Sequence, residues 1–302
     1  MKRDFLTLWD LSSDETESLL ARAKDLKAGK DSGKCPLIGR SLGLLFEKPS
    51  TRTRISFEVG IYQLGAMALT MNPSELQLGR GETLSDTAKT LSRYLSGIVI
   101  RTFAHSTLEQ FSANSSIPVI NGLSDLHHPC QILADMMTII ERKGRLRGLK
   151  VAFIGDGNNV CNSMIEAASL MGFNLTVACP EGFEPDAGIL EKATTASAGS
   201  EIIILRDPKE AAGLADVIYT DVWVSMGQEA HSREKKERFR DYQINDRLLS
   251  CSKKDVTVLH CLPAHRGEEI TDAVLDGPQS AVFDQAENRL HAQKALLEML
   301  IK

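Results

Sequence analysis

Short apolar runs alternate with longer amphipathic stretches along the whole chain, which predicts strands separated by helices. Apolar runs without a polar alternation are typical of parallel strands buried on both faces. Helical periodicity needs longer segments with one apolar face. We expect strands at 42–46, 97–101, 118–122, 150–156, 174–180, 201–205, 216–223 and 256–263, and helices at 53–64, 128–144, 162–173 and 287–302. This order indicates an α/β protein with parallel sheets flanked by helices.

The length of the chain indicates two domains. A single core usually stops growing at about 250–300 residues, and this chain has 302. The polar stretch ERKGRLRGLK after Ile140 suits a boundary. We expect a first domain at 1–140, a second at 141–285, and a terminal helix at 286–302 that packs back on the first.

Charge and cysteine usage exclude several classes of function. The net charge is −5, from 35 basic and 40 acidic side chains, so nucleic acid is not expected as a partner. The first residues lack the pattern of a signal peptide, and we expect no membrane span. The six cysteines are scattered and form no CxxC pair, which favours reduced thiols in a cytoplasm.

The turn after the first expected strand carries Ser50, Thr51, Arg52, Thr53 and Arg54 at the start of a helix. Free backbone N–H groups there bind anions, and an arginine adds a forked donor for phosphate. Capping is the ordinary role of serine and threonine at such a position. Two arginines oppose the helix dipole, however, and an anion would resolve that conflict.

A second cluster, HHPCQ, begins another helix. His128 occupies the expected N-cap and Gln131 follows one turn later, so both can polarise a carbonyl oxygen. A histidine beside a proline is more often structural. Adjacent histidines also suit a metal, but no third ligand stands at a recognisable spacing, and no metal site is expected.

Two turns in the second half, GDGNNV and DVWVSMG, follow expected strands and carry further candidate residues. In GDGNNV, Gly155 and Gly157 are compatible with a dinucleotide site, although Val160 replaces the third glycine; a plain tight turn is the alternative. Asn158 and Asn159 can bond a carboxylate. In DVWVSMG, Asp221 can pair with an ammonium or cap a helix, the two being equally favoured.

The segment 225–245 predicts a solvated helix after a loop, and that loop also suits a lid. In HCLP, Cys261 ends a strand, where a buried cysteine is more often inert than nucleophilic, and a Leu262–Pro263 bond can be cis.

The joint order of these motifs is specific. STRTR, Arg101, HPCQ, DGNN, DVWVSMG, HCLP and the pair Asn288–Arg289 resemble the aspartate/ornithine carbamoyltransferase family over essentially the whole chain. HCLP and DVWVSMG are similar to its ornithine branch. Cys130 departs from the threonine frequent at that position and lies between the matching His128 and Gln131.

The resemblance implies two half-sites in an interdomain cleft, with no cofactor. It assigns catalysis to Arg52, Arg101, His128 and Cys261. Ornithine binding is assigned to Asn159, Asp221, Ser225 and Met226. Carbamoyl phosphate would be bound by Ser50, Thr51, Arg52, Thr53, Gln77 from a neighbouring subunit, Arg101, His128, Gln131, Cys261, Leu262 and Arg289.

The implied reaction moves the carbamoyl group of carbamoyl phosphate to the δ-amine of L-ornithine, giving citrulline and phosphate. It implies a homotrimer, or an assembly of trimers, in arginine biosynthesis. Acetylornithine, putrescine or aspartate are the alternative acceptors. A nicotinamide-dependent oxidoreductase is an alternative that leaves STRTR and HCLP unexplained. A non-catalytic sensor of a small anion is a third alternative, and steady-state transfer of carbamoyl to an amine distinguishes it from the enzyme.

Overall fold

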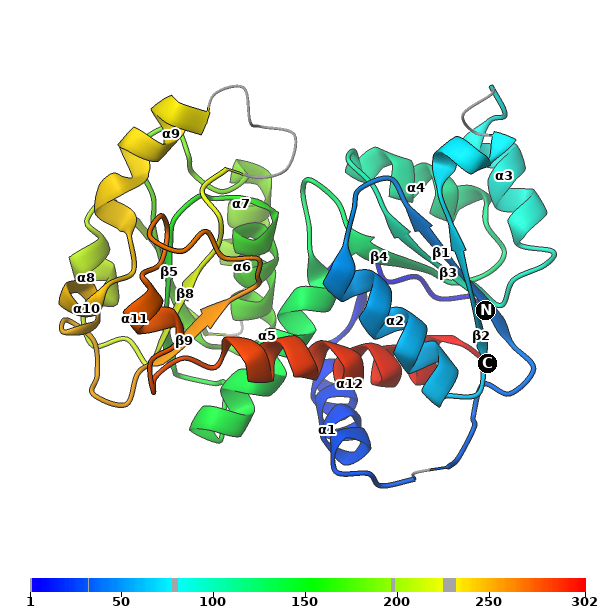
Figure 1. The fold of residues 1–302 in the computed structure, drawn as a ribbon, viewed down its shortest axis with the longest axis horizontal. Helices are drawn as coiled ribbons and strands as arrows, with labels where there is room; N and C mark the ends of the chain where they lie inside the picture. Colours follow the sequence, from blue (N-terminus) through cyan, green and yellow to red (C-terminus); the bar gives the residue numbers. More distant parts are fainter. Residues whose placement is uncertain (1, 32, 78–80, 197–198, 225–231) are drawn as a thin grey trace. The chain divides into compact units, whose positions relative to one another are not determined.

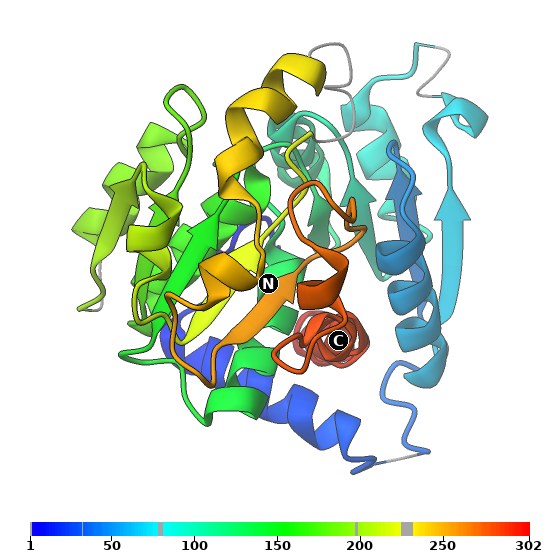
Figure 2. The ribbon, with the colours of Figure 1, turned by 60° about the vertical axis from the view of Figure 1, so that its left-hand side comes forward.

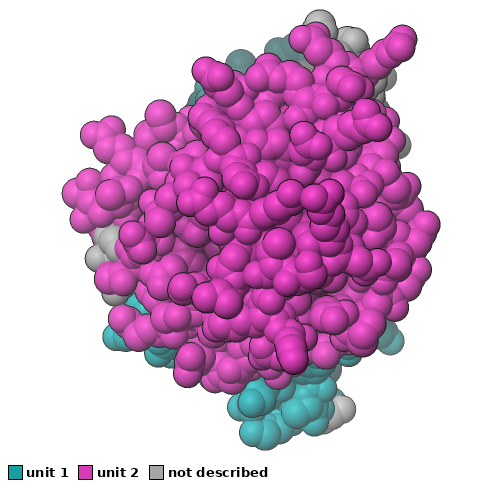
Figure 3. Space-filling model, turned by 90° about the vertical axis from the view of Figure 1, so that its left-hand side faces the viewer, with its two compact units in different colours: residues 1–137, 287–302 teal, residues 138–286 magenta. Residues whose placement is uncertain are grey.

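The computed structural model describes residues 2–31, 33–77, 81–196, 199–224 and 232–302. The chain divides into two compact units, which Figure 3 colours separately. Unit 1 comprises Met1–Met137 and Glu287–Lys302, and unit 2 comprises Thr138–Ala286. Two helices, α5 (Pro129–Lys143) and α12 (Val282–Leu300), contribute residues to both units.

Unit 1 is built on a four-stranded parallel sheet in the order β2-β1-β3-β4. Strands β3 and β4 are buried along their whole length, whereas β2 is an exposed edge strand. Helices flank the sheet (Figure 1). The strands are β1 (Ser41–Phe46), β2 (Met67–Met71), β3 (Gly97–Arg101) and β4 (Val119–Leu123), and the helices within this unit are α1 (Ser13–Lys27), α2 (Thr51–Gln63), α3 (Leu84–Leu91) and α4 (His105–Asn114).

Unit 2 contains a five-stranded parallel sheet in the order β7-β6-β5-β8-β9, seen as one twisted sheet with helices against it in Figure 2. Its core includes buried side chains of β8 and β9 together with Trp223 and Phe239. The strands are β5 (Lys150–Ile154), β6 (Asn174–Ala178), β7 (Ile202–Leu205), β8 (Val217–Thr220) and β9 (Thr257–His260), and the helices are α6 (Asn159–Met171), α7 (Ala187–Thr195), α8 (Pro208–Ala212), α9 (Ser232–Phe239), α10 (Asp246–Leu249) and α11 (Asp272–Leu275).

The strand orders determine where ligands can bind. In each sheet the order in which successive strands are added reverses once, between β1 and β3 in unit 1 and between β5 and β8 in unit 2. In open parallel sheets, ligand sites form at the carboxyl ends of the strands beside such a reversal. The STRTR turn follows β1 and Arg101 ends β3, while the GDGNN turn follows β5 and Asp221 follows β8. Both sets of motifs therefore lie at the positions that this topology favours.

The predicted α/β class with two helix-flanked parallel sheets is confirmed. Every predicted strand has its counterpart, with ends that shift by a few residues. The edge strand β2 was not predicted, although its sequence MALTM is apolar except for Thr70, and most of its side chains are exposed. No helix in the described part of the chain is both long enough and apolar enough to cross a bilayer.

Candidate active site

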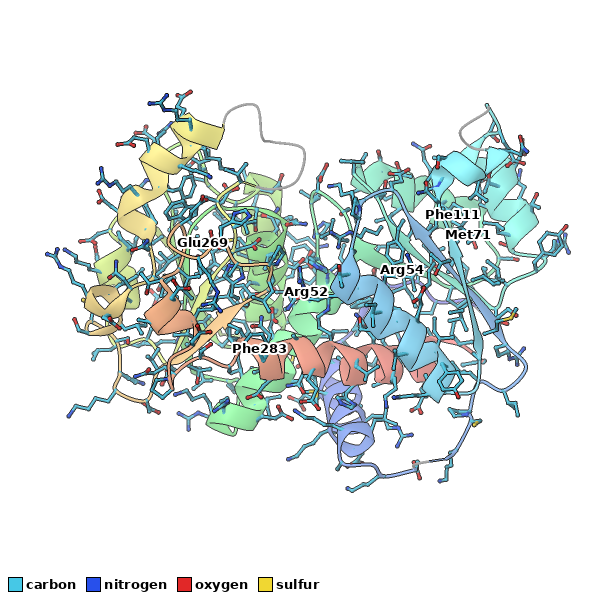
Figure 4. The ribbon with its side chains drawn as sticks, viewed as in Figure 1. Arg52, Arg54, Met71, Phe111, Glu269 and Phe283 are labelled. Carbon is cyan, nitrogen blue, oxygen red and sulfur yellow. The ribbon has the colours of Figure 1, made fainter. Side chains whose placement is uncertain are left out.

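The first candidate half-site begins at the N-terminus of α2. Ser50 is the N-cap, and its Oγ accepts the backbone N–H of Thr53 at 3.2 Å. Arg52 and Arg54 both lie in the first turn, where cations are unfavourable (Figure 4). Arg54 is exposed and bonds Glu58 one turn later at 3.0 Å, which gives it a local structural role. Arg52 is half-buried, so the conflict with the helix dipole concerns Arg52 most directly.

A buried polar cluster joins α2 to three other elements of unit 1. Thr53 Oγ1 accepts a hydrogen bond from Arg289 Nη2 at 2.6 Å and lies 3.5 Å from Arg101 Nη1. Arg289 Nη1 donates to the amide oxygen of Gln131 at 2.6 Å, and that amide donates to Asp135 at 2.8 Å. The structure therefore brings four of the expected residues, Thr53, Arg101, Gln131 and Arg289, into one network.

A register shift helps to place Arg101 in this cluster. Ile100 pairs with Asn121 whereas Arg101 pairs with Leu123, so Gly122 is an extra residue on β4. Such irregularities re-aim side chains at strand ends. A Cβ at Gly122 would lie 3.1 Å from Val99, so glycine allows the close approach of the two strands.

His128 lies close to the positive charges of three arginines. Its side chain is buried, and burial lowers its pKa well below the usual value, with further lowering from Arg289, Arg101 and Arg52. The imidazole is therefore neutral near pH 7, which leaves it one N–H donor and one acceptor nitrogen. A positive site with a neutral imidazole can bind an anion and polarise a carbonyl oxygen at the same place.

A histidine pair beneath this turn was not found from the sequence. His105 Nδ1 lies 3.0 Å from Ser124 Oγ, and Ser124 Oγ accepts the backbone N–H of His127 at 3.1 Å. The rings of His105 and His127 meet edge to face at 4.6 Å between centroids. The segment preceding His128 is thus held by Ser124, which follows β4, and by His105 at the start of α4.

This pair gives unit 1 a pH dependence with a defined sign. Burial, followed by the proximity of His127, lowers the pKa of His105 from 6.5 to about 4. Between these values the unfolded chain binds more protons, so stability is complete above pH 6.5 and is lost as pH falls toward 4. We expect His105→Gln to reduce this loss, measured by urea unfolding at pH 7 and pH 4.5. The exposed His265→Gln serves as the control, and identical acid losses in wild type and His105→Gln would contradict the assignment.

Asp221 is the centre of the second candidate half-site, in unit 2. Its carboxylate is buried and accepts hydrogen bonds from the amide of Asn158 at 2.7 Å, the thiol of Cys261 at 2.7 Å and the backbone N–H of Val222 at 2.8 Å. These three donors are all neutral. The described donors therefore place no positive charge on Asp221, which suits a cation of a ligand at this position.

The GDGNN turn is a helix cap rather than an open nucleotide loop. Asn158 is the N-cap of α6, and its oxygen accepts the N–H groups of Val160 and Cys161. A Cβ at Gly157 would lie 2.2 Å from the backbone nitrogen of Pro185, so this glycine is explained by close packing of two loops. Asn159 is the first residue of α6. The side-chain amide of Asn158 donates to the carboxylate of Asp221, a residue of the protein itself, at 2.7 Å.

The HCLP turn is supported by a buried pair. Leu262 has a left-handed backbone at φ 55°, and the Leu262–Pro263 bond is cis. The N–H of Leu262 donates to His260 Nδ1 at 2.8 Å, so the ring proton sits on Nε2 and donates to Glu269 Oε1 at 3.1 Å. Cys261 is half-buried and lies between these contacts.

Two groups in unit 2 bring three metal-type ligands within 4.8 Å of one another: Asp221, His260 and Cys261; and His265, Glu268 and Glu269. In the first group, Cys261 already donates to Asp221, and both ring nitrogens of His260 are engaged. In the second, Glu268 pairs with Lys236 at 2.6 Å. Hydrogen bonds among the described residues account for both groups without an ion.

Three expected site residues are not placed with either cluster. Gln77 is exposed, and its carbonyl accepts the N–H of Glu82 at 3.1 Å. Ser225 and Met226 lie outside the residues that the structure describes. Asp156 and Lys235, which form a buried ion pair beside Asp221, were not proposed from the sequence, although an acid at the end of β5 was a usable signal.

Comparison with known proteins agrees with this arrangement. The carbamoyl-P binding domain model of the aspartate/ornithine carbamoyltransferases matches residues 3–141, and the Asp/Orn binding domain model matches residues 147–300. The ornithine carbamoyltransferase of Syntrophus aciditrophicus is 56% identical over 303 residues, covering 100% of each chain.

Two solved structures are similar along the whole chain. Ornithine carbamoyltransferase from Pyrococcus furiosus is 50% identical with a TM-score of 0.95, covering 99% of this chain and 97% of that one. Anabolic ornithine carbamoyltransferase from Campylobacter jejuni is 41% identical with a TM-score of 0.93, covering 99% of each. With both domain models matched across the two units, this chain belongs to the aspartate/ornithine carbamoyltransferase family.

Proposed function

We propose that this protein transfers the carbamoyl group of carbamoyl phosphate to the δ-amine of L-ornithine, producing L-citrulline and phosphate. The observation that carries the proposal is that Arg101 and Arg289 both approach Thr53 in the first turn of α2, beside Arg52 and close to a neutral His128. That arrangement suits a ligand that joins a phosphate to a polar carbonyl group. The names of the relatives support ornithine as the acceptor.

Unit 1 is the proposed carbamoyl-phosphate half-site. The N-terminal N–H groups of α2 and the guanidinium of Arg52 would bind the phosphate, which gains charge as it leaves. The expected ligands in this half-site are Ser50, Thr51, Arg52, Thr53, Arg101, His128, Gln131 and Arg289, with Gln77 reaching in from a neighbouring subunit.

Attack on the carbamoyl carbon develops negative charge on its oxygen. Thr53, Arg101 and His128 are the proposed donors to that oxyanion. One such donor is typically worth about 3 kcal/mol in the transition state. The network that links Thr53 to Arg101, Gln131 and Arg289 holds two of these donors, Thr53 and Arg101, in place before the substrate arrives, so little reorganisation of them is needed at the moment of reaction.

Unit 2 is the proposed ornithine half-site. Asp221 would bind the α-ammonium, while Asn159 and the backbone near Met226, with Ser225, would bind the α-carboxylate. Cys261, which donates to Asp221, and Leu262 would line the path of the side-chain amine. A primary amine is mostly protonated near pH 7, so the site must favour its neutral form. The proton released on attack can pass to the departing phosphate, and the chemistry needs no cofactor or covalent intermediate.

The amine that accepts the carbamoyl group distinguishes this activity from other carbamoyl transfers. Acetylornithine and putrescine are the alternative acceptors. A site built for an ammonium and a carboxylate rejects a compound that leaves either group unpaired. We expect the specificity constant for ornithine to exceed those for acetylornithine and putrescine by about a hundredfold or more. Carbamoyl transfer to each amine, followed as product formation, measures this directly. Equal use of acetylornithine would assign the protein to a different acceptor.

A trimer is the proposed assembly. Ile55, Val59 and Tyr62 recur at helical spacing on α2 and are exposed, as are Met67 and Leu69 on the edge strand β2. An apolar surface of this kind, beside an unpaired strand edge, supports contact with a second copy of the chain. We further propose a cytoplasmic, biosynthetic role, which the scattered cysteines without a CxxC pair and the similarity to an anabolic enzyme support.

Subunit sharing of Gln77 can be tested by complementation. If Gln77 serves the site of a neighbour, a hybrid of inactive Gln77→Ala and inactive Arg52→Ala chains contains sites with neither lesion. We expect reassembled mixtures to regain part of the wild-type activity. A mixture of Arg52→Ala with Arg289→Ala is the control, because those residues belong to the same half-site and no intact site can form. Hybrids that assemble without regaining activity would argue against sharing.

A further inference from the structure

We propose that the Lys235–Asp156 ion pair sets the charge of the acceptor half-site, leaving Asp221 as the carboxylate that receives the substrate's ammonium. The pair acts by positioning charge rather than by touching the reacting atoms. This inference rests on the proposed function and deepens it, because it names what makes one of two neighbouring carboxylates the acceptor for ornithine.

The ion pair is enclosed by protein. Lys235 Nζ on α9 lies 2.6 Å from Asp156 Oδ2, directly after β5, and each side chain is 10% exposed. The same ammonium lies 5.2 Å from the ring centroid of Phe183 and 5.7 Å from that of Phe239. Removing one partner of such a pair leaves an uncompensated charge in a place that water reaches poorly.

Asp156 is tied to Asp221 through one asparagine. The carbonyl of Asp156 accepts the N–H of Asn158 at 2.7 Å, and the side-chain amide of Asn158 donates to Asp221 at 2.7 Å. Burial raises the pKa of Asp156, the Lys235 ammonium opposes that rise, and the charge of Asp221 adds to it. The two carboxylates therefore influence each other, and Lys235 is the cation that separates their roles.

The charges around Asp156 and Asp221 explain why the ammonium of ornithine would bind to Asp221 rather than to Asp156. Asp156 is balanced by Lys235, whereas the hydrogen bonds of Asp221 in the described structure come from Asn158, Val222 and Cys261, which are neutral. An incoming ammonium therefore finds one unbalanced carboxylate. Without Lys235 there would be two, and a charged Asp156 would compete with Asp221 for the ammonium. Ornithine would then lose its single preferred position.

The test compares Lys235→Met, Asp156→Asn and the double variant with wild type. We expect Lys235→Met to raise the KM for ornithine about tenfold or more, while the KM for carbamoyl phosphate changes less than about threefold. Asp156→Asn should also raise the ornithine KM, because the positive charge of Lys235 then faces no charge at position 156 and opposes the substrate ammonium. The double variant has neither charge and should recover to within about threefold of wild type.

Lys236→Met is the matched control. Lys236 is the next residue on α9 and pairs with the partly exposed Glu268, so its removal should leave both KM values within about twofold. Lys235→Arg keeps the charge and should retain an ornithine KM near that of wild type. It also provides a folded comparison if the methionine variant is unstable, and thermal unfolding of every variant checks this.

The outcomes separate the two claims. A double variant as impaired as Lys235→Met would overturn the charge assignment, since lost packing of Lys235 is not repaired at Asp156. Equal rises in the KM for both substrates would do the same. Wild-type protein that forms no citrulline would overturn the proposed function, and this inference with it. Active wild-type protein without rescue overturns the inference alone.

Discussion

Arg52→Ala is expected to reduce kcat/KM by about a thousandfold or more without unfolding the protein. Arg52 lies in the first turn of α2, where its charge opposes the helix dipole, and it is among the charges that lower the pKa of His128. Its proposed partner is the phosphate, whose charge grows as the carbamoyl group is attacked. The loss of a forked contact to that charge costs several kcal/mol, and about 1.4 kcal/mol corresponds to a tenfold change in rate.

The matched control is Arg54→Ala, two residues along the same turn. Arg54 is exposed and bonds Glu58, so its removal should change kcat/KM by less than about threefold. Steady-state kinetics of both variants, with calorimetric binding of carbamoyl phosphate, measures the difference. Thermal unfolding should show that Arg52→Ala still folds, because the charge it removes opposes the dipole of α2. Near-normal turnover by folded Arg52→Ala would reject the phosphate assignment.

Asp221→Asn is expected to reduce the specificity constant for ornithine by about a hundredfold or more while leaving carbamoyl-phosphate binding nearly unchanged. Asparagine has the same shape but no charge to pair with the α-ammonium. One of its two polar atoms is also a donor, which would face the donating amide of Asn158 or thiol of Cys261. Most of the proposed carbamoyl-phosphate ligands lie in unit 1 and are untouched by this change, so the affinity should fall little even though Cys261, a further expected ligand, donates to Asp221.

Asp216→Asn is the control for a buried aspartate of the same unit. Asp216 precedes β8, where it pairs with Lys253 at 2.6 Å and accepts the N–H of Lys150 at 2.9 Å. It therefore lies at the opposite end of the strand from Asp221. We expect this variant to be less stable but to keep the wild-type KM for ornithine. Loss of carbamoyl-phosphate binding in folded Asp221→Asn would show that the two half-sites have been assigned to the wrong units.

Local sequence was sufficient for the strands and for several helix ends. The run Gly97–Arg101 was predicted as a strand and is β3, because buried parallel strands need apolar side chains on both faces. Pro129 begins α5 as expected, since proline suits a first helical turn. Short polar helices such as α10 were not predicted, because their few residues form no clear apolar period and packing decides them.

By itself, the sequence determined the α/β class, the family and the motifs of both half-sites, because periodicity, turn residues and motif order are local properties of the chain. Only the tertiary structure decided which charges meet. Arg289 bonds Thr53 across 236 residues of sequence, and Lys235 bonds Asp156 across 79. No local pattern encodes such a pairing, because it depends on the order in which the strands are arranged in each sheet. That arrangement separates Arg54, which serves its own helix, from the arginines that surround His128.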